Sequence, residues 1–445
     1  MTRIGSVLAL GCLVAVFGSG ASAGTTTSWS RVTDPGGRNI DQVGLARTGD
    51  GVLHVVWRRQ AGTEESVRHA AIQRNGTVGA PTTAVGGLRG LSDPDLVLNT
   101  DGGLLVFYGA ITPSPGGVRM SSASAAAANW TGPGKVSFDA QGGTPGASVQ
   151  KNGTPIFAWA AGTNTYYKIG TDAAQKDGFL GPSPKCCFYD PEVAVDDASG
   201  AAFVAYHSNV GGAPGVFVRQ ILPSLGTPQL APGALTNGNF IPPDHRIPLV
   251  GRQGGGVFLA YCGGYPTCKD VRLWRVGGSA LVVSKGGKDV ENVNLARGPE
   301  GRLWVMWEDS SQLYAARTNR SANKVGTIVR VGPPPGTSTL WDDFGEGSLG
   351  PLDLLAHVSV GSAIATWHRQ VLPGLSFSCA ARAKTVRCLV ADAGDPVSGA
   401  AVKIGGKQLK TGAQGTVSAK LQTGTFAAVV SKAGYTGATA RVRVR

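Results

Sequence analysis

The fold is indicated by one stretch near the N-terminus, VGLARTGDGVLHVVW at residues 43–57. It contains an apolar strand, a Thr-Gly-Asp-Gly turn and a second apolar strand that ends at an aromatic residue, Trp57. Short apolar runs joined by a Gly-containing turn are typical of antiparallel β-hairpins. The stretch therefore predicts an inner strand paired with a second strand.

The same pattern recurs along most of the chain, with closing aromatic residues 46–60 positions apart: Trp57, Tyr108, Trp159, Tyr206, Tyr261, Trp307 and Trp367. In the seventh copy it predicts the two strands at 354–358 and 363–367. A period near 50 residues, built of strands and tight turns, is the signature of propeller blades. We therefore predict an all-β chain in which residues 24–378 form a seven-bladed β-propeller. The alternative is an array of two-sheet sandwiches, but seven evenly spaced copies of the pattern favour the ring.

The seventh copy lacks an outer strand of its own. The segment 27–33, ahead of the first copy, matches that missing strand in length and pattern. We expect the N-terminal segment to close the ring by completing the seventh blade.

The composition agrees with a turn-rich globular protein. The 445 residues include 67 Gly and 26 Pro, which favours many turns over long helices. Collagen is excluded because no Gly-X-Y period runs through the chain. The 42% of hydrophobic residues and only 16% of charged ones exclude a disordered, solvated chain.

The first residues resemble a targeting signal. Arg3 precedes the apolar run 7–17, and Ala21-Ser-Ala23 has the small-x-small pattern that signal peptidase cleaves. The run is shorter than the roughly 20 residues that a membrane span needs, and Ala-Leu-Gly before Cys12 is a poor lipoprotein box. We predict a signal peptide at 1–23, no membrane span, and a product that is secreted or held in the cell envelope.

Six cysteines follow the signal peptide, and an even number in an exported chain suggests disulfides. The spacing favours two local loop clamps, which leaves a vicinal pair by elimination: Cys262–Cys268, Cys379–Cys388 and Cys186–Cys187. Zinc is the alternative, but no pair has the C-x2-4-C spacing and no His-x3-5-His follows. We predict no metal and no cofactor.

The C-terminal part differs in composition from the repeats. After Cys388 the sequence contains no Trp, His, Glu or further Cys. Strands are predicted at 400–404, 415–421, 426–430 and 440–445. Four of its segments resemble the carboxypeptidase regulatory-like modules: 395–402, 411–415, 424–426 and 432–435. The resemblance implies a small transthyretin-like β-sandwich at 379–445, of a kind common at the ends of exported bacterial proteins.

The positive charge is concentrated in this same part. The whole chain has a formal net charge of +13, and residues 379–445 hold six Lys, five Arg and two Asp. Arg441, Arg443 and Arg445 alternate along one predicted strand and share a face. We expect the tail to contact an anionic surface, the alternative being a basic module that is merely soluble. No nucleic-acid partner is predicted.

In a propeller, the loop that enters an inner strand and the loop that leaves the second strand open on the same face. Both acids and bases are predicted there: Asp93, Asp95, Asp190, Glu192, Asp244, His245, Arg246, Asp289, Glu291, Arg58, Arg59, His207, Glu308, Asp309, His368 and Arg369. Such a mouth is a plausible ligand pocket, although several of these side chains could simply cap turns. The predicted ligand-binding residues are Arg246, His245, Asp244, His207, Glu308, Asp309, His368 and Arg369.

The segment 245–250, followed by Gly256 and the apolar run 257–260, resembles the Arg-Ile-Pro segment of sialidases. The resemblance implies that Arg246 would grip a sialic-acid carboxylate, a bidentate contact suited to guanidinium. The chain departs from that six-bladed family in the position of the motif, in its seven copies and in the absence of a Ser-x-Asp-x-Gly-x-Thr-Trp box.

Other catalytic signatures are missing: the sequence has no Gly-x-Ser-x-Gly, His-Glu-x-x-His or Gly-Lys-Ser/Thr motif. Trp341 and Tyr265 are candidates for stacking on sugars, the alternative for Trp341 being a place in the core of an outer strand. The first hypothesis is a secreted, non-enzymatic propeller whose loop face binds an extracellular glycan, a cell-envelope polymer or a protein. The second is a sialidase-like glycoside hydrolase or lyase that uses Arg246 and mouth carboxylates.

Overall fold

The structure is a computed structural model, and it describes residues 28–33, 42–139, 142–162, 164–182, 190–208, 215–234, 246–263, 268–361 and 363–445. The regular secondary structure of these ranges is almost entirely β-strand, with one short 3-10 helix at Pro299–Gly301. None of their helices has the length and apolar character needed to cross a membrane. The predicted signal peptide and the Cys186–Cys187 pair lie outside the described residues.

Antiparallel four-stranded sheets follow one another along the chain. The first is β2 (Val43–Arg47), β3 (Leu53–Ala61), β4 (Glu64–Ile72) and β5 (Thr82–Leu88). The next is β6 (Asp95–Leu98), β7 (Leu104–Ala110), β8 (Gly117–Ala123) and β9 (Gly134–Lys135). The third is β10 (Pro145–Val149), β11 (Pro155–Ala161), β12 (Asn164–Ile169) and β13 (Gly178–Pro182). Then come β14 (Glu192–Val195), β15 (Ala202–Ser208), β16 (Gly215–Leu222) and β17 (Gln229–Leu230).

The next sheet has seven strands: β18 (Leu249–Gly251), β19 (Val257–Gly263), β20 (Cys268–Arg275), β21 (Ala280–Arg297), β22 (Leu303–Asp309), β23 (Gln312–Arg317) and β24 (Val329–Val331). The long strand β21 pairs with β20 through its first part and with β22 through its second part. Strand β21 is therefore the outer strand of the group β18, β19, β20 and β21, and the inner strand of the group β21, β22, β23 and β24.

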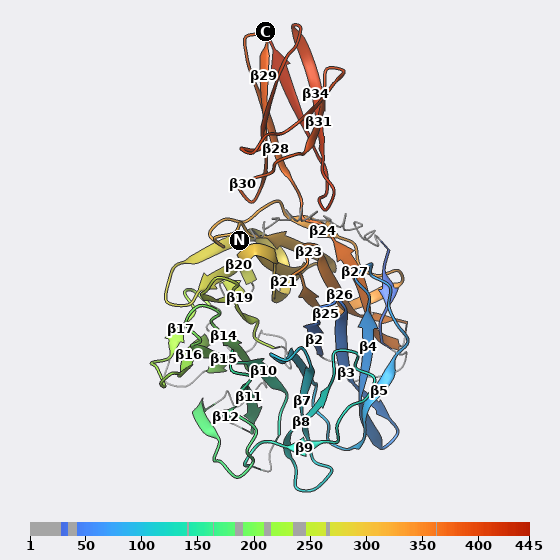
Figure 1. The fold of residues 1–445 in the computed structure, drawn as a ribbon, viewed down its shortest axis with the longest axis vertical. Coiled ribbons are helices and arrows are strands. Elements are labelled where there is room, and N and C mark those ends of the chain that lie inside the picture. The colour runs from blue at the N-terminus through green and yellow to red at the C-terminus, as the bar shows by residue number, and fades with distance from the viewer. Residues whose placement is uncertain are drawn as a thin grey trace, which may run out of the picture.

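The inner strands close into a ring. Each contacts the next in the order β2, β6, β10, β14, β18, β21 and β25 (Thr337–Glu346), and β25 contacts β2 again (Figure 1). Sheets arranged radially around an axis in this way form a β-propeller. The inner strands approach closely: a Cβ at Gly146 would lie 2.2 Å from the carbonyl oxygen of Pro191 ahead of the next inner strand. Glycine is required there because any side chain would separate the two strands.

Aromatic and aliphatic side chains of the second strands fill the space between neighbouring sheets. Trp57, Tyr108, Trp159 and Trp307 are at most 2% exposed. The buried clusters combine residues of adjacent sheets, as in the cluster that holds Val56 of β3 together with Val106 of β7. Each sheet thus supplies one wall of the core of its neighbour, which is why the repeats are stable only together.

The last sheet corrects one prediction. Its order is β25, β26 (Leu352–Val360), β27 (Ala363–Val371) and β1 (Ser30–Arg31). The segment predicted as the inner strand lies in β26, the second strand, and the segment predicted as the second strand lies in β27, the third. The true inner strand β25 was missed because its Trp-Asp-Asp segment interrupts any apolar run.

The expected closure of the ring by the N-terminal segment is confirmed. Strand β1 pairs with β27 in the register Ser30–His368 and Arg31–Trp367. Because β27 is the third strand, β1 is the outer strand that the last sheet would otherwise lack.

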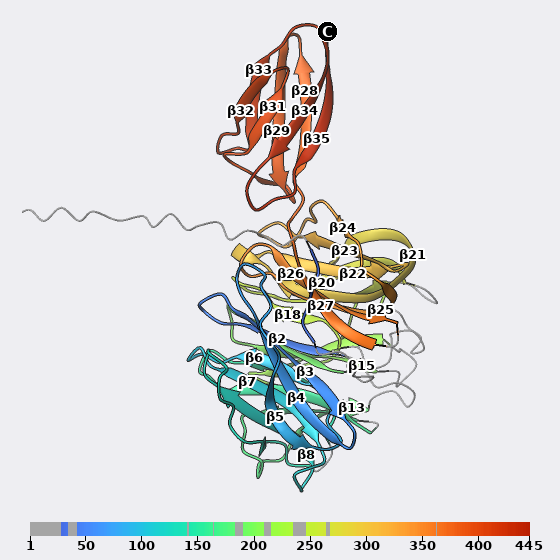
Figure 2. The same ribbon diagram turned by 90° about the vertical axis from the view of Figure 1, so that its right-hand side faces the viewer.

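The C-terminal residues form two further sheets. One contains β28 (Ser376–Arg382), β29 (Thr385–Asp392), β30 (Asp395–Pro396) and β33 (Thr416–Lys420). The other contains β32 (Lys407–Lys410), β31 (Ala401–Ile404), β34 (Gly424–Ser431) and β35 (Ala438–Val444). They share one apolar core and stand at one edge of the ring (Figure 2). We call residues 376–445 the C-terminal unit; it begins at β28, three residues before the boundary expected from the sequence.

Both acidic residues of the C-terminal unit contact the propeller. Asp392, which is 1% exposed, accepts hydrogen bonds from Arg302 Nε at 3.2 Å and from Arg317. Asp395 accepts from Arg302 Nη2 at 2.6 Å, and Tyr435 packs on the Arg317 guanidinium. The unit is thus anchored on Arg302, directly before β22, and on Arg317 at the end of β23, and both of its acids take part in these contacts.

Candidate functional site

The central cavity of the ring has two ends, which we name by the chain segments that form them. The loop face is the end where the inner strands begin and includes Gln42, Asp190 and Arg246. The hairpin face is the end where the inner strands turn into the second strands and includes Asn99, Lys151 and Asp197.

Arg246 lies directly before β18 and crosses the cavity near the loop face. Its Nη1 is 2.9 Å from Asp95 Oδ1 on β6, and its Nε is 3.4 Å from Glu192 Oε2 on β14. Its Nη2 donates to the carbonyl oxygen of Pro145 at 3.1 Å. Since β10 and β14 separate β6 from β18 in the ring, the Arg246–Asp95 pair joins distant parts of it. All three charged side chains are at most 13% exposed.

Burial and charge together shift the proton equilibria of this group. Burial, followed by the charge of Asp95, raises the pKa of Glu192 well above its usual range. Burial also raises the pKa of Asp95, although the Arg246 charge opposes the shift. Burial acts to lower the pKa of Arg246, but four carboxylates raise it overall: Asp95, Glu192, Asp190 and Asp93. One guanidinium therefore faces four acids at the centre of the ring.

A second side-chain bond crosses the same end. Gln42, directly before β2, donates from Nε2 to Asp190 Oδ2 at 2.7 Å, and both residues are at most 5% exposed. Asp95 in turn accepts from the backbone N–H of Ala147 at 2.7 Å on the neighbouring inner strand. Two side-chain contacts, Arg246 with Asp95 and Gln42 with Asp190, therefore join non-adjacent inner strands at this end.

The predicted ligand-binding residues that the structure describes lie in different parts of the fold. Asp244 and His245 lie outside the described residues. His207 is 2% exposed, and burial lowers its pKa to about 4. His368 is completely buried in β27, where its Nε2 is 2.8 Å from Asp353 Oδ1. Neither His368 nor the next residue, Arg369, follows a second strand, because the prediction for the last sheet was displaced by one strand.

Two further predicted residues lie near the loop face in β22. Glu308 is 6% exposed and accepts a hydrogen bond from Asn292 Nδ2 at 3.1 Å, whereas the neighbouring Asp309 accepts one from Ser310. Asn292 has a left-handed φ of 49° at an irregularity in β21. Its Nδ2 therefore also reaches the carbonyl oxygen of Trp341 at 2.7 Å.

Trp341 is an exposed aromatic side chain near this end. It is 51% exposed, and its indole Nε1 donates to Ser359 Oγ at 2.7 Å. An exposed ring held in one orientation by a hydrogen bond is a suitable platform for a flat, partly apolar ligand.

The sequence contained an unused signal for the buried acids. Asp95 and Glu192 belong to Asp-Pro-acid segments that directly precede an apolar inner strand, Asp93-Pro-Asp and Asp190-Pro-Glu. Repetition of that segment in two blades marks a common structural position. Gln42 and Asn292 had no comparable signal.

The open space is at the hairpin face. A cavity of about 660 Å³, which we call the funnel, is lined by the ends of the inner strands and by their turns. A narrower space of about 160 Å³, which we call the waist, continues from it toward the loop face. Asp95 and Glu192 line both, and Arg246 lines the waist. Arg246 is the only arginine among the described residues that line the waist, so the structure does not show an arginine triad there.

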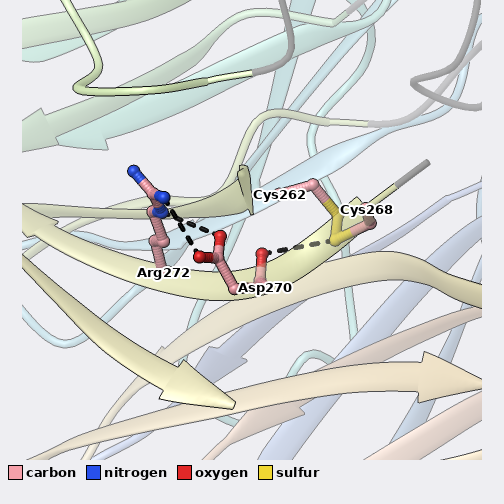
Figure 3. Close-up of a disulfide and its surroundings, with 4 residues drawn as sticks. All are labelled: Cys262, Cys268, Asp270 and Arg272. Carbon is pink, nitrogen blue, oxygen red and sulfur yellow. Dashed lines mark hydrogen bonds and ion pairs between the residues drawn. A yellow bond between two sulfur atoms is a disulfide. The ribbon is translucent and has the colours of Figure 1, made fainter. Parts of the chain in front are cut away.

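The disulfides expected for two cysteine pairs are present. Cys262 at the end of β19 is bonded to Cys268 at the start of β20, next to an ion pair of Asp270 with Arg272 (Figure 3). Cys379 and Cys388 are directly opposed on β28 and β29. This second bond joins two paired strands rather than clamping a loop. Within the described ranges, no group of three acidic, His or Cys side chains could hold a metal ion.

Comparison with known proteins supports the fold. No protein-family model and no curated protein matches the chain. A structure described as streptogramin B lyase is similar with a TM-score of 0.50 and 11% identity, over 79% of this chain and 100% of the other. A virginiamycin B lyase from Staphylococcus aureus has a TM-score of 0.45 and 11% identity, over 77% and 99%. A leech intramolecular trans-sialidase has a TM-score of 0.43 and 8% identity, over 66% of this chain and 68% of the other. Identities this low concern the propeller fold alone.

Proposed function

We propose that the chain is a secreted, non-enzymatic, seven-bladed β-propeller with a carboxypeptidase regulatory-like β-sandwich at its C-terminus. Its loop face binds an extracellular ligand: a glycan, a cell-envelope polymer or a protein. The closed cycle of seven inner strands supports the blade number, and the shared core of two sheets supports the sandwich. The two disulfides are compatible with an oxidising compartment.

One observation favours binding over hydrolysis. The arginine that a sialidase-like site would use, Arg246, is held by Asp95 and Glu192 and by the carbonyl oxygen of Pro145. A substrate carboxylate would have to displace two anionic partners from a nearly buried guanidinium, which is unfavourable. Arg246 therefore serves as a cross-link between blades.

The ligand surface is proposed at the rim near Trp341. The fixed, exposed indole supplies a stacking face, and Glu308 and Asp309 lie at the end of β22, which Asn292 connects to Trp341. Aromatic faces beside hydrogen-bonding groups suit sugar rings, which have apolar C–H faces and polar edges. Among the candidate classes, this arrangement favours a glycan.

The test is a glycan array supplemented with cell-envelope fractions, probed with the wild-type protein, Trp341→Ala and a matched control. The control is Phe179→Ala, because Phe179 is 52% exposed on β13, away from the rim. We expect Trp341→Ala to lose at least tenfold in affinity and the control to bind like the wild type. Equal binding of both variants contradicts the proposed surface, and turnover of aryl-glycosides or sialosides by the wild-type protein contradicts a non-enzymatic function.

We also propose that the C-terminal unit contacts an anionic polymer. Lys403, Lys410, Arg441 and Arg443 are exposed on the outer face of the sheet formed by β31, β32, β34 and β35. No acidic residue offsets them, since Asp392 and Asp395 bind the propeller.

Elution from a polyanion column measures this contact. The double substitution Arg441→Glu/Arg443→Glu is expected to lower the salt concentration at which the protein elutes, because the contact is screened by salt. The matched control Lys384→Glu/Lys420→Glu makes the same charge change away from that face. An equal shift for both variants would mean that only net charge matters.

A further inference from the structure

The first two blades meet along a seam in which Val56 of β3 packs with Val106 of β7. Near the hairpin face this seam ends in two buried histidines. His54 shares a face of β3 with Val56 and is 2% exposed, and His69 on β4 is 6% exposed. His54 Nδ1 is 2.9 Å from His69 Nε2, and the rings stack with their centroids 5.2 Å apart. One hydrogen bond therefore joins the two imidazoles.

The hydrogen bonds around this pair run in one direction. Thr48 Oγ1 donates to Asp50 Oδ1 at 2.6 Å, so it accepts from His54 Nε2, which is 3.3 Å away. His54 Nδ1 is then the acceptor within the pair, and His69 Nε2 is the donor. A further proton on His54 Nδ1 would bring two N–H groups face to face and break this bond.

The seam is an unfavourable place for a charged imidazole. His69 contacts Trp130 of the second blade, with ring centroids 5.8 Å apart, and an indole offers a donor but no acceptor. Burial lowers the pKa of His54, and the charge of Asp50 opposes the shift. Burial, followed by the charge of His54, lowers the pKa of His69 to about 4. The stabilisation by the neutral pair is therefore fully present above the unfolded pKa near 6.5 and is lost as the pH falls from there toward 4.

Further charged side chains face the seam nearer the loop face. Arg58 Nε is 3.1 Å from Glu65 Oε1, and Glu65 Oε2 accepts the backbone N–H of Leu91, ahead of the second blade, at 2.7 Å. On the second blade, Arg119 lies opposite Tyr108 of the seam cluster and is held by proline carbonyl oxygens. The loop-face end of the seam thus has a cross-link of its own, apart from the histidines.

The histidine pair lies behind the wall of the funnel. Ala46 of β2 is directly opposite His54 in the sheet register, and it lines the funnel. On the second blade the wall continues with Leu96 and Val97. Leu96 and Ala46 belong to the same apolar cluster. A separation of the two blades at this end would therefore widen the funnel between β2 and β6.

From this geometry we infer that acid opens the seam at its hairpin end. Protonation of the histidine pair breaks its hydrogen bond, and β3 and β4 separate there from the second blade while Glu65 continues to bind Leu91. The opening widens the funnel, so that access to the central cavity increases as the surroundings acidify. The inference does not depend on the proposed glycan surface, which lies at the other end of the ring.

Labelling of a buried thiol tests the inference in the full chain. Ala46→Cys places a thiol in the seam, and Ala147→Cys is the matched control. Both alanines are 6% exposed, lie on inner strands and line the funnel, but Ala147 belongs to the seam between the second and third blades, where Phe107 stacks on Phe157. Labelling by dithiodipyridine is measured at pH 7.5 and pH 5.0, with the wild-type protein as background and a small thiol as the reference for each pH. We expect Ala46→Cys to react at least tenfold faster at pH 5.0, and Ala147→Cys to change less than twofold.

Two further substitutions, each combined with Ala46→Cys, identify the group that responds. His69→Gln supplies an N–H donor to His54 without a titratable ring, and it is expected to reduce the acid effect to less than threefold. His207→Gln removes a different buried histidine, toward the loop face, and is expected to leave the acid effect within twofold of that of Ala46→Cys alone.

Four results would overturn the inference. These are no acceleration of Ala46→Cys at pH 5.0, an equal acceleration of Ala147→Cys, an unchanged acid effect in His69→Gln, or its loss in His207→Gln. Equal acceleration at both thiols would indicate general loosening of the ring rather than opening of one seam. If His69→Gln does not fold, the comparison of the two thiols still decides, because neither of them alters a histidine.

Discussion

The two ends of the central cavity are built from the same seven inner strands but differ in what closes them. Near the loop face, side-chain bonds cross the axis from Arg246 to Asp95 and from Gln42 to Asp190. At the hairpin face, small and aliphatic side chains leave a funnel open. The difference shows that a ring of polar residues at the start of inner strands can be part of the scaffold, whereas open volume lies where the residues are small.

The largest expected effect comes from breaking the side-chain contacts that cross the axis near the loop face. Arg246→Ala leaves Asp95 and Glu192 buried without their cation, and we expect it to lower the free energy of unfolding by about 3–5 kcal/mol. Urea unfolding at pH 7 measures this. Adding Glu192→Gln to the variant is expected to restore part of the loss. A loss below about 1 kcal/mol would mean that the ion pairs do not hold the ring together.

Lowering the pH provides a second comparison of the two ends, because each end contains a buried histidine. Burial lowers the pKa of His207, toward the loop face, and of His69, next to His54 near the hairpin end, to about 4. A lowered histidine pKa means that stability is fully present above the unfolded pKa near 6.5 and is lost as the pH falls from there toward 4. At pH 5 each is expected to cost about 2 kcal/mol.

Unfolding measured between pH 7.5 and 4.5 for His207→Gln and for His69→Gln checks this expectation. In each variant, the free energy of unfolding should lose the part of its pH dependence that one buried histidine contributes. A variant whose pH profile is identical to that of the wild type would show that its histidine titrates normally in the folded state.

The smallest effect is expected at the open rim. Lys151→Leu removes an exposed side chain and is expected to change the free energy of unfolding by less than about 0.5 kcal/mol. Gln42→Leu, near the loop face, removes the Gln42 N–H donor from the buried Asp190 carboxylate and is expected to cost about 1–3 kcal/mol. Thermal unfolding of the two variants side by side tests the contrast, which fails if their melting temperatures fall equally.

Sequence periodicity was sufficient for the architecture because each repeat carries its own turn and closing aromatic. It placed Trp57 in a second strand and the N-terminal segment in the last sheet correctly. It failed in the last sheet, where β26 is as apolar as an inner strand and β25 contains the polar Trp341-Asp-Asp segment. Asp342 and Asp343 are nevertheless buried, at 4% and 0% exposure, so in β25 burial is not accompanied by an apolar run.

The site was harder to predict because its contacts join distant repeats. The Arg246–Asp95 pair spans 151 positions, and the Gln42–Asp190 pair spans 148. Sequence reasoning placed Arg246 and both acids at one mouth, but it could not show that their charges are paired with each other. That pairing depends on which blades face across the ring.

The pairing of β1 with β27 has a consequence for the order of synthesis. Ser30 pairs with His368, so the first strand of the ring waits for a partner made 338 residues later. At roughly 5–20 residues per second, that delay is about 17–70 seconds. During that time the β1 segment has no partner strand, so the ring can close only after β27 has been made.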